Sequence, residues 1–344
     1  MAFKRWPKRE MLEPEEVIDL YRNGFAGATP STPQTRAAFA SAVRATGGVM
    51  NVADAAAANG WAGSHAGKLV IPFVHVVKAY PGVWPGPAQQ RGDCVSHGGK
   101  NARLLTVVCE AVAGLPDEET GKVEGLPDIP PEGIKNGGFS TEASYWFRGH
   151  GGDGWQCESD AAVALKYAGA VVRKPYPEVG IDLTKYSGSL AGKYGRSKPP
   201  ANIADVLDNN LIRTAARVSG FDAIRDALGN GYGINSCGGE GFSSSRDAHG
   251  YSMRRGSWSH AMGIIGADDR PEIHDLYGGP GLLLLNSWGR FNSGPRTILG
   301  TDIEIPEGSF WARWKDVVRR SYIAFSGANG WPSQSLPDYL GGIR

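Results

Sequence analysis

Three residues far apart in the chain have side chains that together can perform acyl transfer: Cys94, His260 and Asn286. A thiol attacks a carbonyl efficiently only as the thiolate, so it needs a nearby group that accepts its proton. An imidazole can accept that proton when a third group fixes the orientation and tautomer of its ring. Cysteine, histidine and asparagine can fill these three roles, and these residue types therefore predict a nucleophilic cysteine site.

The sequence around each residue bears on whether it is catalytic or structural. A lone cysteine is usually a small buried hydrophobe, but Cys94 directly follows Asp93 and lies among polar and small residues, which is unusual for a core position. His97 lies three residues after the cysteine, and we expect it to be exposed or to face a cleft rather than to act as the base. His260 alone fits a structural histidine, and Asn286 downstream favours the catalytic interpretation.

Asn286 begins the segment 286–289, Asn-Ser-Trp-Gly, which directly follows an apolar run over 281–285. On these residues, and on the histidine before them, the chain resembles the papain-like (C1) family of cysteine peptidases over roughly residues 80 to 326. In that family a barrel strand delivers the asparagine to the histidine, and the tryptophan shields their hydrogen bond from water. The resemblance implies these roles for Asn286 and Trp288.

The resemblance also implies a glutamine shortly before the nucleophile, whose amide helps to hold the oxyanion. The family has this glutamine six residues before the cysteine, where the present chain has Ala88. Allowing one deleted residue selects Gln89, and Gln90 is the alternative. Asp93 occupies a position that is usually small and neutral in the family. Its charge would stabilise a His260 cation but oppose thiolate formation.

A glycine-rich segment, residues 151–155, is similar to the part of the family that binds the backbone of the substrate. We therefore expect Gly152, Gly154 and Trp155, together with Ser259 beside the histidine, to contact substrate. Glycines allow an extended peptide to pair closely with the main chain of an enzyme. A plain surface loop accounts for the same segment nearly as well, so both interpretations stay open.

The resemblance implies an α+β fold, the papain-like two-domain cysteine peptidase fold. A helical half, residues 67–230, would supply the cysteine, and an antiparallel β-barrel half, residues 231–326, would supply the histidine and the asparagine. An N-terminal helical extension covers residues 1–66, and a C-terminal tail covers 327–344. The active site would be the cleft between the two halves.

Apolar spacing predicts several individual elements. Apolar residues over 95–113 recur at helical intervals. Cys94 would lie at the start of this helix, where unpaired amides and the helix dipole favour an anion. Gly98 and Gly99 weaken that prediction or allow close packing beneath the cleft. We also expect short helices over 13–22, 33–45, 52–59, 158–168 and 222–228, and a mostly apolar strand over 69–77.

Composition limits the partners that we expect. The chain has 344 residues and a formal net charge of +1, which gives no reason to expect a nucleic acid partner. No run approaches the ~18 apolar residues that span a bilayer, and the basic N-terminus lacks the apolar stretch of a signal peptide. We therefore expect no membrane partner, and a protein that is cytoplasmic or packaged in a particle.

The four cysteines are few and widely spaced, which indicates reduced thiols in an intracellular protein. Cys109 falls within the predicted central helix and is expected in the core. Cys157 and Cys237 could be close in space, although nothing in the sequence demonstrates it. Neither has a second ligand at metal-site spacing, so we expect no metal and no cofactor.

The role of residues 1–66 stays open between two interpretations. Many papain-like enzymes carry an N-terminal segment that covers the cleft until it is removed, which would make the extension inhibitory. This extension is shorter than most such segments, and the chain begins at Met1. We therefore lean slightly towards an arm that docks to a partner or an assembly.

The function implied by the resemblance is that of a cysteine endopeptidase that hydrolyses polypeptides through a thioester. The order of Cys94, His260 and Asn286 agrees with the family, and the first interval is somewhat longer than the usual ~130 to 150 residues. The alternative is a papain-fold structural or assembly protein, for example a virion component, with an idle or single-use site. A third class is another thiol acyl-transfer enzyme such as a peptidoglycan amidase.

Overall fold

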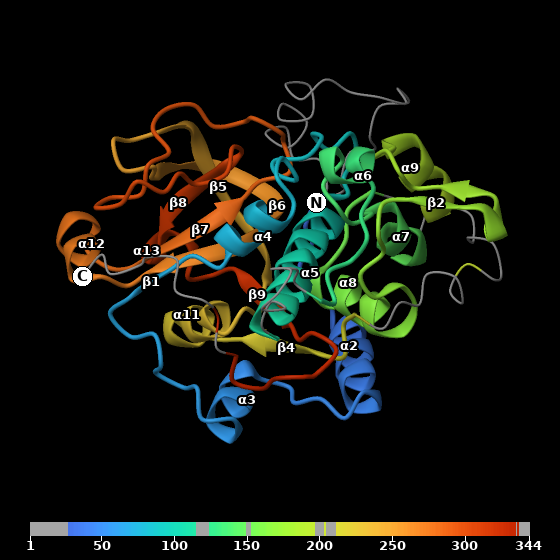
Figure 1. Cartoon of the computed structure of the whole chain (residues 1–344), viewed down its shortest axis with the longest axis horizontal. Helices are drawn as coiled ribbons and strands as arrows, with labels where there is room; N and C mark the ends of the chain where they lie inside the picture. Colours follow the sequence, from blue (N-terminus) through green and yellow to red (C-terminus); the bar gives the residue numbers. More distant parts are fainter. Residues whose placement is uncertain are drawn as a thin grey trace.

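The computed structural model describes residues 27–114, 124–148, 153–196, 203, 211–334 and 336. A central helix, α5 (Cys94–Ala113), lies between a mainly helical half and a half built on an antiparallel sheet (Figure 1). This confirms the expected α+β class. Among the described residues, no helix combines the length and the apolar character required to cross a bilayer.

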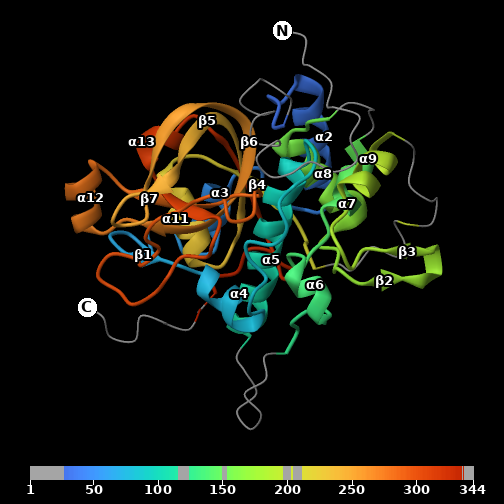
Figure 2. The same ribbon diagram turned by 90° about the horizontal axis from the view of Figure 1, so that it is seen from above.

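The sheet half is a curved seven-stranded sheet (Figure 2). Its centre is a long hairpin formed by β5 (Ile234–Arg246) and β6 (Ser252–Asp268). Five other strands complete it in the order β4-β9-β5-β6-β7-β8, with β1 paired to the end of β6. These strands are β1 (Leu69–Val70), β4 (Ala215–Val218), β7 (Gly281–Leu285), β8 (Ser309–Arg313) and β9 (Ser321–Phe325).

The register of the sheet determines which polar residues meet. On one side of β6, His260 pairs with Gly238 of β5. On the other side, Gly263 of β6 pairs with Leu285, the last residue of β7. Because Asn286 directly follows β7, its side chain emerges beside the part of β6 that carries the histidine.

The helical half consists of short elements around α5. The predicted helix over 158–168 is present as α8 (Cys157–Val163), which continues as a π-helical turn, η2 (Ala164–Ala168). The other elements are α6 (Pro131–Lys135), α7 (Glu142–Tyr145), η1 (Trp146–Arg148), β2 (Pro175–Tyr176), η3 (Pro177–Val179), β3 (Ile181–Asp182) and α9 (Gly188–Arg196).

The predicted helices over 33–45 and 52–59 are confirmed as α2 (Pro33–Ala45) and α3 (Val52–Ala58). The side chain of Thr32 caps α2 by accepting a hydrogen bond from the amide of Thr35 at 3.2 Å. Helix α2 packs on α8, and α3 packs on α11 (Phe221–Gly229), which confirms the helix predicted over 222–228. Two further helices are α12 (Pro271–Tyr277) and α13 (Trp314–Val317). The helix predicted over 13–22 lies outside the described residues.

The strand predicted over 69–77 is wrong beyond its first two residues. The strand β1 ends at Val70, and α4 (Phe73–Ala79) follows Pro72. Phe73 and Val76 are buried and three residues apart, so they lie on one face of the helix, and α4 packs on α5. Burial of that face outweighs the preference of the valines for a strand.

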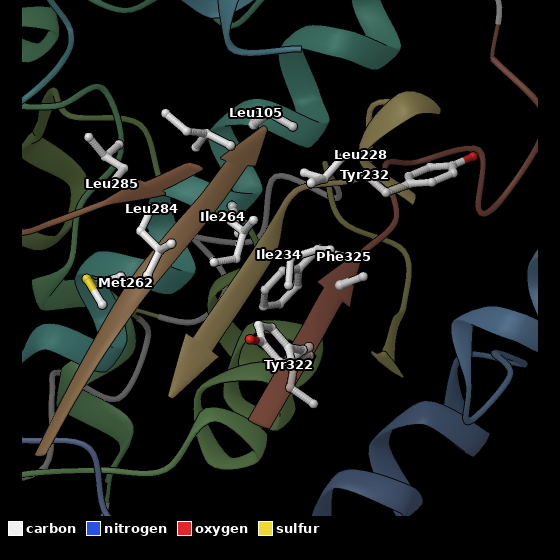
Figure 3. Close-up of a cluster of buried hydrophobic side chains, with 14 of the residues drawn as sticks. Leu105, Leu228, Tyr232, Ile234, Met262, Ile264, Leu284, Leu285, Tyr322 and Phe325 are labelled. Carbon is white, nitrogen blue, oxygen red and sulfur yellow. The ribbon is translucent and has the colours of Figure 1, made fainter. Parts of the chain in front are cut away.

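The main hydrophobic core joins α5 to the sheet (Figure 3). Leu105 of α5 packs in a cluster with Ile234, Ile264, Leu284 and Phe325, which come from four neighbouring strands and are fully buried. Burial of each such side chain contributes about 2 kcal/mol to the free energy of folding. The core thus holds the start of α5 in register with the strands that carry the histidine.

Glycines at the start of α5 allow this close packing, as the sequence suggested. A β-carbon on Gly98 would lie 2.3 Å from Oδ1 of Asn235 on β5, and one on Gly99 would lie 2.0 Å from a carboxylate oxygen of Asp160 on α8. Larger residues at either position would push α5 away from its neighbours. The energetic cost of two helical glycines is therefore offset by the approach of three elements.

The expectation of four reduced thiols is wrong. Cys157 at the start of α8 forms a disulfide with Cys237 of β5, whereas Cys94 and Cys109 are free. The two bonded cysteines are 80 residues apart and have no recognisable pairing motif, so only the tertiary fold reveals them. The disulfide links the helical half to the central hairpin. Cys109 is in the core, as predicted.

We expect the double variant Cys157→Ala/Cys237→Ala to have a free energy of unfolding lower by roughly 4 kcal/mol. The disulfide restricts a loop of 80 residues in the unfolded chain, and long loops gain most from closure. Urea unfolding without reductant measures the difference. Cys109→Ala is the control, because it removes a thiol but no cross-link. Equal stability of wild type and double variant would contradict the cross-link.

Candidate active site

Cys94 is the first residue of α5, with Asp93 at the N-cap. The helix start provides amide groups and a positive dipole end, which favour a thiolate over a thiol. The first turns of α5 lie against the hairpin, where the side-chain amide of Asn235 on β5 donates to the carbonyl of Val95 at 3.1 Å. Cys94 is buried with 0% of its surface exposed. It is therefore a candidate nucleophile within a covered site.

His260 and Asn286 form the hydrogen bond that the sequence predicts between them. Nε2 of His260 lies 2.8 Å from Oδ1 of Asn286, and both side chains are fully buried. The second ring nitrogen, Nδ1, is the one that can serve as a base. The asparagine oxygen also accepts the amide of Ser287 at 2.7 Å, which fixes the asparagine in turn.

Two tryptophans enclose the imidazole of His260. The ring of Trp288 stacks on it, with centroids 4.5 Å apart and planes inclined by 26°. Trp258 meets the imidazole edge to face at 6.1 Å and meets Trp288 at 4.7 Å. Trp288 occupies the shielding position that the family resemblance implies. Trp258 was not anticipated, because nothing in its local sequence separates it from a core residue.

Burial lowers the pKa of His260 to about 3. The hydrogen bond with Asn286 raises this pKa, and the positive charge of Arg320 lowers it further. The imidazole is therefore neutral near neutral pH and can accept a proton. A buried neutral histidine hydrogen-bonded through one nitrogen has the tautomer fixed by its partner, as a base requires.

Arg320, just before β9, connects the histidine with the cysteine electrostatically. Its Nη2 donates to the carbonyl of His260 at 2.8 Å. Burial lowers the pKa of Arg320, while Tyr322, Glu240 and Cys94 act in the opposite direction. The guanidinium is thus near enough to interact with the nucleophile as well. Sequence analysis missed this residue, since an arginine before an apolar strand carries no functional signal.

The two candidate glutamines have different surroundings. The backbone of Gln89 donates to the carbonyl of Ser287 at 2.7 Å, and its side-chain oxygen accepts from the hydroxyl of the same serine. Its side-chain amide donates to the carbonyl of Arg91 at 2.6 Å. The side chain of Gln90 instead accepts from the amide of Gly188 on α9 at 3.2 Å. Gln89 is therefore the glutamine beside the asparagine segment.

His97 is buried, so the expectation that it is exposed is wrong, whereas its place on the side of a cleft stays a prediction. Its Nε2 lies 3.6 Å from Oδ2 of Asp93, and its ring packs edge to face on Tyr186. The hydroxyl of Tyr186 donates to the same carboxylate oxygen at 2.9 Å. Burial raises the pKa of Tyr186 well above its usual value, so it remains a donor. The carboxylate of Asp93, beside the nucleophile, therefore contacts His97 and Tyr186.

Main-chain groups of Trp155 and Ser259 hold a segment of the N-terminal extension. Ala28 forms a parallel bridge with Trp155, in which Trp155 donates to Gly27 at 2.8 Å and Thr29 donates to Trp155 at 2.7 Å. The amide of Ala28 also donates to the carbonyl of Ser259 at 2.7 Å, and the hydroxyl of Ser259 donates back to Ala28. Residues 27–29 thus bridge two elements that were predicted to bind substrate.

The structure describes one of the two glycines that were predicted to contact substrate. Gly154 has a φ of +90°, a conformation that favours glycine, and leads directly into the paired residue Trp155. Gly152 lies outside the described residues. Within the part of the chain that the structure describes, no group of three histidine, cysteine or acidic side chains could hold a metal ion.

No protein-family model and no curated protein sequence matches the chain. The solved structures to which it is similar include xylellain, a cysteine protease from Xylella fastidiosa, with 14% identity and a TM-score of 0.42 over 73% of this chain and 88% of that one. Procathepsin B S9 from Trypanosoma congolense has 10% identity and a TM-score of 0.38, covering 91% of this chain and 83% of the other.

Procathepsin L 3 from the larval midgut of Tenebrio molitor has 12% identity and a TM-score of 0.31, over 92% of this chain and 99% of that one. TM-scores below 0.5 describe loose overall similarity, so we base the functional proposal on the site residues. The chain carries sequence motifs that resemble those of papain-like cysteine peptidases and is similar in structure to papain-like cysteine proteases.

Proposed function

We propose that this protein is a cysteine endopeptidase that hydrolyses peptide bonds through a thioester on Cys94. The observation that carries the proposal is the buried hydrogen bond, 2.8 Å long, between Asn286 and His260 of β6, the strand that packs against the helix beginning with Cys94. This observation supports the assignment of His260 as base and Asn286 as its orienting group, two of the roles that thiol acyl transfer requires beside the nucleophile.

In the proposed reaction, Nδ1 of His260 takes the thiol proton and Cys94 attacks the peptide carbonyl. The amide of Cys94 and the side-chain amide of Gln89 donate to the oxyanion, which would require the glutamine to exchange its present acceptor at Arg91. The imidazolium then protonates the leaving amine, and the carbon–nitrogen bond breaks. Water activated by the same imidazole hydrolyses the thioester and regenerates the thiol.

The surroundings of the imidazole support this proposal in a second way. Trp288 and Trp258 cover the ring, so the bond from His260 to Asn286 forms in a medium of low dielectric. Electrostatic interactions are stronger there than in water. The imidazolium that forms during the reaction therefore keeps its orientation towards the thiol.

We expect Cys94→Ala to abolish hydrolysis of a fluorogenic peptide mixture, because no other group can form the thioester. Gln89→Ala should lower kcat by about 10² to 10³, the cost of one oxyanion donor, whereas Gln90→Ala should have little effect. Cys109→Ala is the matched control, since Cys109 is the other free cysteine and lies on the same helix. Turnover that survives Cys94→Ala would refute the proposal.

We further propose that the extension inhibits the enzyme rather than docking it to a partner. Residues 27–29 hydrogen-bond to Trp155 and Ser259, the same main-chain groups that an extended substrate would use. Farther along, the hydroxyl of Ser31 donates to Glu158 of α8, which continues the contact. A substrate and this segment would compete for one set of hydrogen bonds, so either excludes the other.

Removing one of these bonds tests the inhibitory role. Ala28→Pro deletes the amide that donates to Ser259, and a lost bond to a buried carbonyl costs on the order of 1 kcal/mol or more. We expect peptide turnover by the full-length protein to rise about 10-fold. Ala28→Ser keeps the amide and is the control. A docking arm would instead leave turnover unchanged and alter the mass of assemblies measured by light scattering.

The location of the protein is also a proposal. A cytoplasmic location and packaging in a particle were both expected, and the Cys157–Cys237 disulfide favours the second. Disulfides persist in oxidising surroundings and are rare in the reducing cytoplasm. The substrate class that we propose is an extended polypeptide, which fits the main-chain hydrogen-bonding groups of Trp155 and Ser259.

A further inference from the structure

Arg320 is a charged residue next to the proposed site that forms several hydrogen bonds. Its side chain is fully buried and makes four polar contacts. Besides the bond to the carbonyl of His260, Nε donates to the hydroxyl of Ser236 at 2.7 Å and Nη2 donates to the carbonyl of Ser236 at 3.2 Å. Nη1 lies 3.2 Å from a carboxylate oxygen of Glu240. One guanidinium therefore hydrogen-bonds to both strands of the central hairpin.

The hairpin is irregular at this point. Gly238 pairs with His260, but the next pair joins Glu240 to Ser257, so the register shifts just beyond the histidine. Such a bulge leaves main-chain groups without their usual ladder partners. Arg320 donates to the carbonyl of His260 on β6 and to that of Ser236 on β5, next to this shift. The guanidinium thus ties the two strands together at the last regular pairs before the shift.

Gly238 makes room for this arrangement. A β-carbon there would lie 2.5 Å from Cγ of Arg320 and 2.5 Å from a carboxylate oxygen of Glu240. The absence of a side chain opposite His260 thus permits a buried ion pair directly behind the histidine. A buried charge is costly unless it is paired and fully hydrogen-bonded. The cost is offset here by the contacts with Glu240 and Ser236.

We infer that Arg320 is a positioning residue for the proposed peptidase site: it fixes the main chain of His260 and sets the pH range of the Cys94–His260 pair through its permanent charge. This inference rests on the proposed function. The sign of the effect follows from electrostatics, since a nearby cation favours the thiolate of Cys94 and disfavours the imidazolium of His260. Both limbs of the pH profile of kcat/KM therefore lie at lower pH with the arginine than they would without its charge.

Other charged and titratable groups lie near the Cys94–His260 pair. Glu240 on β5 opposes the charge of Arg320, and Tyr322 on β9 is neutral because burial raises its pKa above the usual range. His97 on α5 acts on His260 only electrostatically, and burial lowers the pKa of His97, so it adds little charge near neutral pH. Asp93, next to Cys94, accepts a hydrogen bond from Tyr186 and is the same in every variant used below. Differences between variants of Arg320 and Glu240 therefore report the balance between these two charges.

Two variants of opposite sign test the inference through the pH dependence of kcat/KM for a fluorogenic peptide. Arg320→Gln should move both limbs up by about 1 pH unit, and Glu240→Gln, which leaves the arginine uncompensated, should move them down. Arg320→Lys keeps the charge but not the planar fork, so the limbs should stay in place while kcat falls. The opposite shifts distinguish an electrostatic role from a general loss of stability.

Arg246→Gln is the matched control. Arg246 is a buried arginine at the end of β5 whose guanidinium donates to the carbonyls of Gly294, Pro295 and Ser309 and to none of the proposed catalytic residues. The Arg246→Gln variant should have a lower melting temperature, and the limbs of its pH profile should not move. Unmoved limbs in Arg320→Gln, shifts of the same sign in both charge variants, or an equal shift in the control would overturn the inference.

A second readout separates this inference from the proposed function. The rate of alkylation of Cys94 by iodoacetamide, followed against pH by peptide mapping, needs no peptidase activity. Its midpoint should move up in Arg320→Gln and down in Glu240→Gln even if the wild type cleaves no peptide. Midpoints that do not move would reject the role of Arg320, whereas moving midpoints without turnover would reject only the peptidase.

Discussion

The close approach of helix α5 to the β5–β6 hairpin is the constraint on which the proposed site depends. Gly98 of the helix faces Asn235 of β5, and Gly263 of β6 faces Asn101 of the helix. A β-carbon on Gly263 would lie 3.1 Å from Cβ of Asn101. Because a glycine faces an asparagine at each of these contacts, the start of α5 lies close against the hairpin that carries His260. The apolar core beneath them keeps the contact dry, so the polar groups above it interact at low dielectric.

That contact explains why the site contains so many buried polar groups and yet remains ordered. Asn286 orients His260, Ser287 joins Gln89 to the asparagine segment, and Arg320 holds the histidine's main chain. Each of these groups finds partners on an element that the core already fixes. The disulfide from α8 to β5 adds a covalent link between the two halves next to the same hairpin. The polar site is thus supported from both halves.

Much of this arrangement was predictable from local sequence. Helix α2 has a threonine cap and a proline at its first turn, and α5 has a long apolar period, so both were located within a residue of their observed ends. Helix α4 was missed because seven residues rich in valine resemble a strand, and only packing on α5 decides otherwise. Arg320 and the disulfide were missed for a different reason. Their partners lie 60 to 84 residues away, and no local pattern encodes such pairings.

The central claim is that Cys94 is a nucleophile activated by His260. Trapping of the covalent intermediate tests it most directly: the protein is mixed with a peptidyl nitrophenyl ester, quenched in acid within milliseconds, and mapped by mass spectrometry. The account predicts an acyl group on Cys94 in the wild type, strong depletion of that adduct in His260→Ala, and no adduct on Cys109. Acylation of Cys94 that is equally fast without the histidine, or no acylation of Cys94 at all, would contradict it.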